Sequence, residues 1–381
     1  MTSLYNRAAL ASILFVGATA EESCPCPDDK TLRIGGVSHG NVVDKFWDPV
    51  YAAAERAAMD SSVDLDFARY DESSTLTGQG GQEIVDWMVD TIEKMCTGDN
   101  TVDGMFSTIN DVAVLTALKA NCLANGIPTV IINAGGNLAQ ESGNFLHFIG
   151  ADDYNTGKDG GEKLLAACPT CQRFYCLDHC GGCTSWTDRC RGFEDAVGDA
   201  YGQTIQIDDS SEDAYIASVE SVVIGTNGTW GDDVGLLLGT HQSMILFAEA
   251  LHNKHKKVKL AGVDTSPGLF EVLGDDEWLW GTSQQPYLQG YYPVQMLANT
   301  IRMGGQSLQT FNLETGPTFV TEAPEGQALC NSDPFQSCVV DNAQKPESVS
   351  PLTDDEPSPG ARKLASVTTR FVSAALRIFG I

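Results

Sequence analysis

Residues 125–133 read NGIPTVIIN, and this stretch joins the end of a helix to the start of a buried strand. Asn110 and Asp111 are expected to begin that helix, Asn125 and Gly126 to end it, and Pro128 prevents it from resuming. The β-branched run 129–132 that follows is typical of a strand buried on both faces. A helix, a tight stop and a buried strand in so few residues indicate an α/β fold.

The same unit recurs on both sides of this stretch. We expect further strands at residues 32–37, 65–68, 102–106, 174–177, 204–207, 234–238 and 259–263. Helices are expected between them, and Asp48 is expected to cap the first. Regular alternation of strand and helix implies parallel sheets with helices on both faces. Two rounds of it predict an α/β protein with two doubly wound Rossmann-like lobes joined by a hinge.

Outside the lobes, the sequence predicts three further segments. Residues 1–20 carry basic Arg7, an apolar run and an A-x-A cleavage pattern, which predicts a signal peptide and a secreted or cell-surface protein. The tail 362–381 is apolar and basic, and is either a membrane-surface helix or a frayed terminus. The expected parts are the signal peptide 1–20, an N-terminal lobe of 31–150 plus 286–314, a C-terminal lobe of 151–285 plus 315–325, a disulfide-bearing extension 326–343, and a disordered linker with the tail in 344–381.

All twelve cysteines follow the predicted cleavage site, and an even number behind a signal peptide favours disulfides over zinc ligation. We expect Cys96 to pair with Cys122 across neighbouring helices, and Cys330 to pair with Cys338. Six cysteines are crowded into residues 168–190, and their connectivity is open. We expect no resident metal and no cofactor.

The chain carries 51 acidic and 23 basic residues, and such a surface repels phosphate backbones. Nucleic acid is therefore not an expected partner. Asn227 lies in the one N-x-[S/T] sequon, which marks either a glycan or a simple Asn-Gly turn.

One catalytic motif needs weighing. Residues 36–40 (GVSHG) match the G-x-S-x-G nucleophile elbow, which requires a tight turn from strand through serine into helix. The next expected helix waits until Pro49. A serine esterase using Ser38 is therefore a minor alternative, and no catalytic residue is assigned.

Ligands of doubly wound sheets bind beyond the carboxyl ends of the strands. The residues that follow the expected strands here are aromatic or polar. They are Phe46, Trp47, Ser107, Asn133, Thr240, His241, Asp264 and Gln284.

Six short segments, in their order and spacing, resemble the type I periplasmic binding proteins, specifically the ribose-type, sugar-binding branch. They are 45–49 (KFWDP), 126–131 (GIPTVI), 149–157 (IGADDYNTG), 189–193 (RCRGF), 262–267 (GVDTSP) and 284–291 (QQPYLQGY). The resemblance runs from about residue 31 to 322. It implies a monomeric binding protein, not an enzyme, that closes around a small polar, sugar-like ligand for uptake or sensing. A membrane transporter or receptor is the implied partner.

The resemblance also implies roles for particular residues. Phe46 and Trp47 take the positions that stack on a sugar face, and Arg189 and Asp264 take the charged positions that bind adjacent hydroxyls. Gln284 matches the hinge-side amide. The expected ligand-binding set is Phe46, Trp47, Ser107, Asn133, Arg189, Thr240, Asp264 and Gln284. Against it stand structural alternatives: a hydrophobic staple for Phe46, a surface helix position for Arg189 and a helix cap for Asp264.

Two departures bear on the ligand. Asn133-Ala134 stands where the family has Asp-Arg, and Thr240-His241 stands where it has Asn-Asp. Losing these charged groups favours a larger or less polar ligand than a simple sugar. Residues 38–47 also resemble secreted algal cobalamin-acquisition proteins, so a surface vitamin B12 acquisition protein or a receptor ectodomain is the alternative function.

Overall fold

The computed structural model describes residues 31–42, 44–71, 82–99, 101–181, 183–224, 230, 233–240, 242–274, 276–305 and 312–321. They all belong to the first of two compact units, residues 1–338. The expected signal peptide, the sequon, His241, the Cys330–Cys338 pair, and the extension and tail lie outside the described residues.

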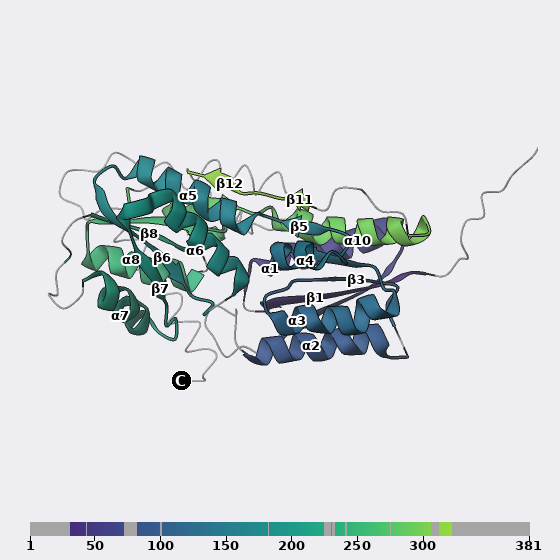
Figure 1. The fold of residues 1–381 in the computed structure, drawn as a ribbon. Helices are drawn as coiled ribbons and strands as arrows, with labels where there is room; N and C mark the ends of the chain where they lie inside the picture. The colour runs from purple at the N-terminus through teal and green to yellow at the C-terminus, as the bar shows by residue number, and fades with distance from the viewer. Residues whose placement is uncertain are drawn as a thin grey trace, which may run out of the picture. The chain divides into compact units, whose positions relative to one another are not determined.

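The first sheet has six strands in the order β11-β5-β4-β3-β1-β2, and its strand pairs are parallel (Figure 1). The strands are β1 (Arg33–Asn41), β2 (Asp64–Tyr70), β3 (Gly104–Ser107), β4 (Thr129–Ile132), β5 (Phe148–Gly150) and β11 (Asn312–Glu314). Its helices are α1 (Trp47–Ser61), α2 (Gln82–Thr97), α3 (Val112–Ala117), α4 (Gly136–Ser142) and α10 (Pro286–Arg302). One apolar cluster joins the sheet to α1 and α10, and another joins it to α2, α3 and α4.

The second sheet has the order β12-β10-β9-β8-β6-β7. Its strands are β6 (Cys171–Asp178), β7 (Tyr201–Gln206), β8 (Asp233–Gly239), β9 (Val258–Val263), β10 (Trp278–Ser283) and β12 (Thr318–Val320). Its helices are α5 (Asp153–Ala167), α6 (Thr184–Val197), α7 (Glu212–Val223), α8 (Gln242–Lys254) and α9 (Pro267–Val272). Again two apolar clusters cover the two faces.

The two sheets have the same strand order, so that β1 corresponds to β6 and β5 to β10, but β12 is antiparallel to β10 whereas β11 is parallel to β5. The predicted fold class, two doubly wound α/β lobes, is confirmed. Within the described residues, the chain passes between the sheets three times: from β5 into α5, from β10 into α10, and from β11 into β12. The numerical lobe boundaries given above stay predictions.

Helix starts were predicted with mixed success. Asp111 caps α3 by accepting a hydrogen bond from the Ala113 amide at 2.7 Å, as expected. The capping role of Asp48 was wrong, because α1 begins one residue earlier, at Trp47. The Asp48 carboxylate instead pairs with Arg69 at 2.8 Å.

In each lobe a pair of helices meets at glycine. A Cβ atom on Gly157 of α5 would lie 1.8 Å from the Arg189 carbonyl oxygen of α6, and one on Gly192 of α6 would lie 2.0 Å from that of Tyr154. A Cβ atom on Gly290 of α10 would likewise lie 2.0 Å from the Val50 carbonyl oxygen of α1. Only glycine permits this backbone approach, which sets α6 and its side chains close to α5.

The described cysteines form four disulfides. Cys96 pairs with Cys122, which confirms the prediction. The crowded six form Cys168–Cys171, Cys176–Cys190 and Cys180–Cys183. The cluster therefore consists of disulfides, and Cys176–Cys190 ties β6 to α6.

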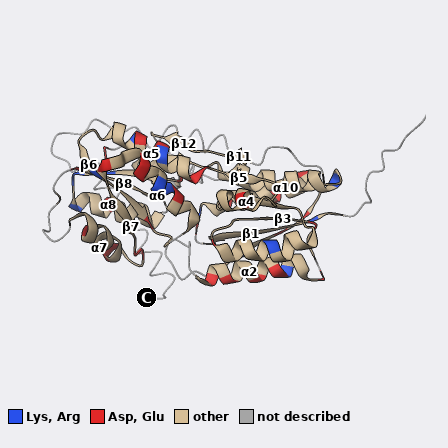
Figure 2. Ribbon diagram, viewed as in Figure 1, with Lys and Arg blue, Asp and Glu red and all other residues tan. Residues whose placement is uncertain are grey.

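Acidic residues are spread over both lobes (Figure 2). On α2 the exposed acids Glu83, Asp86, Asp90 and Glu93 recur at helical spacing. Such a stripe repels anionic partners. Among the helices within the described residues, none combines the length and apolarity needed to cross a membrane.

Candidate functional site

Five of the predicted site residues lie at carboxyl ends of strands. Ser107 ends β3, and the other four directly follow β4, β8, β9 and β10. These four are Asn133, Thr240, Asp264 and Gln284. Their placement at the strand ends is confirmed, whereas their role in ligand binding stays a prediction.

Three of the predicted residues join a chain of hydrogen bonds with a fourth that the sequence did not suggest. Arg189 of α6 contacts Asp153 Oδ1 through Nε and Nη2, both at 2.8 Å. Its Nη2 also donates to Gln284 Oε1 at 3.4 Å. Gln284 Nε2 in turn donates to Asp264 Oδ1. A guanidinium, an amide and two carboxylates thus form one connected polar group.

This group is largely removed from water. The side chains of Arg189 and Asp153 are 5% and 9% exposed, so Arg189 is not a surface helix residue. Burial raises the pKa of Asp153 to about 7, while the Arg189 guanidinium opposes the rise. The Arg189 guanidinium also lies 5.2 Å above the Trp186 ring. These contacts hold the guanidinium in one orientation.

The backbone is strained at this edge of the sheets. Of the non-glycine residues with positive φ within the described residues, three lie here: Asn133 at 57°, Asp264 at 76° and Gln285 at 50°. Such conformations cost free energy and collect at functional sites. Asp264 does not cap α9, because Ser266 does so by accepting from the Leu269 amide.

Gln289 of α10, which sequence reasoning missed, connects the passages between the lobes. Its fully buried amide accepts from Asn133 Nδ2 at 3.0 Å. It donates to the Gln284 carbonyl at 2.9 Å and to Thr315 Oγ1 at 3.0 Å. The Thr315 amide in turn donates to the Gly150 carbonyl at 3.0 Å. One side chain therefore binds residues beside two of the three passages and is connected to the third through the Thr315–Gly150 bond.

The first lobe contributes a buried histidine to this region. His39 near the end of β1 is buried, and its Nδ1 lies 3.0 Å from Thr108 Oγ1. Burial lowers the pKa of His39 to about 4, with the positive charge of Arg189 adding to the effect and Asp44 opposing it. His39 is therefore a neutral imidazole at physiological pH.

A second histidine occupies the matching place in the other lobe. His179 directly follows β6, the counterpart of β1, and is buried. The His39 ring meets the Trp47 ring edge-on at 5.1 Å, and His179 meets Trp186 in the same way at 4.9 Å. Both residues were overlooked, although each comes at the end of the first strand of its round.

The aromatic pair lies differently from the strand-end residues. Trp47 is fully buried in the core beneath α1, against Gly40. Phe46 is half-buried and meets Trp47 edge-on at 5.4 Å. In this structure only Phe46 presents part of its ring to solvent.

Residues 36–40, which match the G-x-S-x-G motif, do not form a nucleophile elbow around Ser38. Ser38 lies inside β1, which continues to Asn41, and no helix follows it directly. Its hydroxyl lies 3.5 Å from that of Tyr51, while the neighbouring His39 ring bonds Thr108. This geometry does not match a nucleophile elbow.

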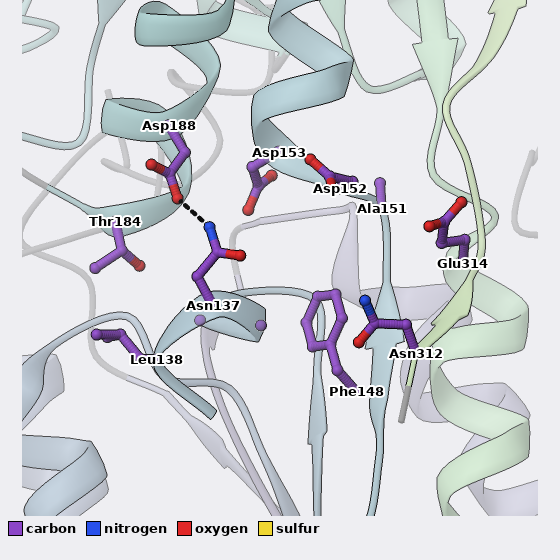
Figure 3. A pocket seen from close by; sticks show the side chains of 12 residues that line it. Asn137, Leu138, Phe148, Ala151, Asp152, Asp153, Thr184, Asp188, Asn312 and Glu314 are labelled. Atoms are coloured by element: carbon purple, nitrogen blue, oxygen red, sulfur yellow. Dashed lines mark hydrogen bonds between the residues drawn. The ribbon is translucent and has the colours of Figure 1, made fainter. Parts of the chain in front are cut away.

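A small acidic pocket lies beside the passage from β5 into α5 (Figure 3). Its acidic lining residues are Asp152, Asp153, Asp188 and Glu314. Asn137 of α4 donates to Asp188 of α6 at 3.0 Å across it. Its volume of about 40 Å³ admits a few waters. None of the eight predicted residues lines it, and it touches their network only through Asp153. Within the described residues, no cluster of His, Cys, Asp or Glu is arranged to hold a metal ion.

Two matching α/β lobes, three passages between them and polar residues at the strand ends define a two-lobed binding-protein fold. The family comparison agrees. A family model described as "Periplasmic binding protein domain" matches residues 34–306, so the chain belongs to this family. The predicted family is thereby confirmed.

Solved structures share the fold. A carbohydrate transporter from Acidothermus cellulolyticus in complex with myo-inositol is 22% identical, with a TM-score of 0.65 over 81% of this chain and 100% of that one. GanP, a glucose-galactose binding protein from Geobacillus stearothermophilus, is 18% identical, with a TM-score of 0.62 over 77% and 98%. A Burkholderia graminis solute-binding protein in complex with D-arabinose is 19% identical, with a TM-score of 0.62 over 78% and 98%. No curated protein matches the chain.

Proposed function

We propose that this protein is a solute-binding protein that acts outside the cytoplasm and closes its lobes around a small, polar, sugar-like ligand. It binds the ligand without transforming it and serves uptake or sensing. The observation that carries the proposal is the buried chain from Asp153 through Arg189 and Gln284 to Asp264. Gln284 and Asp264 of this chain lie at strand ends, where doubly wound sheets bind ligands, and the helices α5 and α6 supply Asp153 and Arg189.

The chemistry of this chain suits a hydroxylated ligand. A guanidinium held in one plane presents N–H donors in a fixed fork, and a carboxylate accepts from two hydroxyls. Arg189 is held by Asp153 and lies over the Trp186 ring, so little side-chain entropy is lost when a ligand binds. Several proteins of the same fold were solved with polyhydroxylated molecules, among them myo-inositol and D-arabinose.

A second candidate, a surface cobalamin-acquisition protein or receptor ectodomain, is favoured by the first lobe. Ser107, Asn133 and neutral His39 give it few charged groups at the strand ends. Such a surface suits a larger or less polar ligand than a simple sugar. Loss of membrane retention on deletion of residues 345–381 would favour the receptor role.

A thermal-shift panel of monosaccharides, polyols including myo-inositol, nucleosides and corrinoids tests the proposal. A ligand at about 100 times its dissociation constant should stabilise the fold by roughly 2.7 kcal/mol. Stabilisation by monosaccharides or polyols supports the first candidate, and stabilisation by corrinoids alone supports the second. No shift with any class, or ester turnover that Ser38→Ala abolishes, would overturn both.

A further inference from the structure

We propose that the Cys180–Cys183 disulfide is a thiol-exchange site, which a small dithiol reduces while Cys168–Cys171 stays oxidised. The two disulfides form a natural comparison within one lobe. Each spans a sequence separation of 3, and their Cα atoms are 5.5 and 5.4 Å apart. Because the closed loops are equal in length, loop-closure entropy does not distinguish them.

The two pairs lie at opposite ends of helices. Cys183 is the N-cap residue of α6, whereas Cys168 is the C-cap residue of α5. A helix N-terminus stabilises a negative charge and a C-terminus destabilises it. Reduction should therefore give a low-pKa thiolate at Cys183 and a high-pKa thiol at Cys168.

The cap of α6 supplies a second, local reason. In the disulfide form the Cys183 side chain makes no capping hydrogen bond. A free thiolate at the same position can accept from the first-turn amides of α6, as an N-cap serine or aspartate does. Stabilising the reduced form makes a disulfide more oxidising, so Cys180–Cys183 should open first.

Access also differs between the pairs. Cys180 is half-buried, whereas Cys168 and Cys171 are 3% and 9% exposed. An incoming thiolate therefore bonds to Cys180 Sγ, the Cys180–Cys183 bond breaks, and the electron pair leaves on Cys183 Sγ. The second thiolate of the dithiol then attacks the other dithiol sulfur, which is bonded to Cys180 Sγ in the mixed disulfide. That bond breaks and Cys180 leaves as a thiolate. The dithiol is oxidised to its cyclic disulfide and the protein gains two electrons.

The disulfide lies between the buried His179 and a contact with the other lobe. Cys180 follows His179, and Asp178 Oδ1 accepts from the Cys180 amide at 2.9 Å. On the far side, Thr184 Oγ1 donates to the Ile109 carbonyl of the first lobe at 3.3 Å. Reduction should loosen the backbone at Cys180 and Cys183 and so weaken ligand binding.

The test uses the full-length oxidised chain in buffers of graded reduced-to-oxidised dithiothreitol ratio. Quenching with an alkylating reagent and peptide mass spectrometry then give the reduced fraction of each pair. We expect Cys180–Cys183 to open at a ratio at least about tenfold lower than Cys168–Cys171, equivalent to about 30 mV. Opening together, or Cys168–Cys171 first, overturns the proposal. Because no ligand is needed, this outcome is independent of the proposed function.

Two matched double variants test whether loss of the Cys180–Cys183 disulfide weakens ligand binding. Cys180→Ser with Cys183→Ser should weaken binding of the strongest ligand from the thermal panel by at least about tenfold. Cys168→Ser with Cys171→Ser should leave affinity within about twofold. Equal affinities in the two variants would show that the Cys180–Cys183 disulfide does not support ligand binding. In Cys180→Ser alone, alkylation against pH should give Cys183 a pKa below the usual 8.5 or so, and a higher value contradicts the exchange site itself.

Discussion

Arg189 Nη2 and Gln284 Oε1 lie 3.4 Å apart although the two residues are separated by 95 positions in the sequence. The contact joins α6 to the passage that leaves β10. The same Nη2 atom contacts Asp153 Oδ1 at 2.8 Å, beside the passage that leaves β5. The charged group is thus assembled where the chain leaves and re-enters the first lobe, so the proposed ligand would act directly on the hinge.

Asp264→Asn should weaken ligand binding by at least about tenfold, the scale of losing one charged hydrogen bond. Asparagine has the size of aspartate and tolerates its left-handed backbone, so stability should change little. Isothermal titration with the strongest ligand from the thermal panel measures the effect. The exposed Asp208→Asn is the matched control. Equal affinity in the two variants would mean that Asp264 does not touch the ligand.

Gly157→Ala should destabilise the protein by roughly 1–3 kcal/mol, the usual cost of overpacking. The added methyl would overlap the Arg189 carbonyl and push α6 from α5, which outweighs the modest gain in helix propensity. Urea unfolding measures the change. Glu162→Ala, at an exposed position of the same helix, should stay near wild type. A Gly157→Ala protein as stable as this control would contradict the close packing.

The burial of His39 and of Asp153 makes the stability of the fold depend on pH in opposite directions. The pKa of His39 falls from 6.5 to about 4, so between these values only the unfolded chain binds the proton, and acid destabilises the fold. The pKa of Asp153 rises from 3.8 to about 7, so there only the folded chain keeps the proton, and stability falls as pH rises.

Urea unfolding from pH 4.5 to 8 should separate the two effects. As pH falls below 6.5, the free energy of unfolding of His39→Gln should rise relative to that of wild type. As pH rises from 4.5 to 7, the free energy of unfolding of Asp153→Asn should rise relative to that of wild type. Each difference should reach the order of 3 kcal/mol. Curves parallel to wild type would show that neither group titrates as the burial implies.

The sequence predicts the fold well because hydrophobic periodicity and helix stops are local signals. The run 129–132 is a strand because its own residues require burial. The strand ends that carry Asn133 and Asp264 follow from the same signals. The strand Trp278–Ser283, which Gln284 follows, was not among the expected strands. Asp153 and Gln289 could not be found in this way, because their role depends on partners far along the chain. His39 was missed because one histidine beside a strand is indistinguishable from a core residue until its counterpart His179 is seen in the other lobe.

Gln289→Leu should destabilise the protein by roughly 2–4 kcal/mol. Leucine fills a similar volume but strands three buried groups: Asn133 Nδ2, the Gln284 carbonyl and Thr315 Oγ1. Each buried polar group left without a partner costs about 1–3 kcal/mol, and the hinge relaxes part of that cost. Gln295→Leu on the same helix is the control, since its amide makes longer contacts, at 3.4 Å to Ala57 and 3.5 Å to Tyr291. Hydrogen exchange should also quicken beside the three passages in Gln289→Leu alone. Equal exchange in both variants would show that Gln289 packs beside the hinge without holding it.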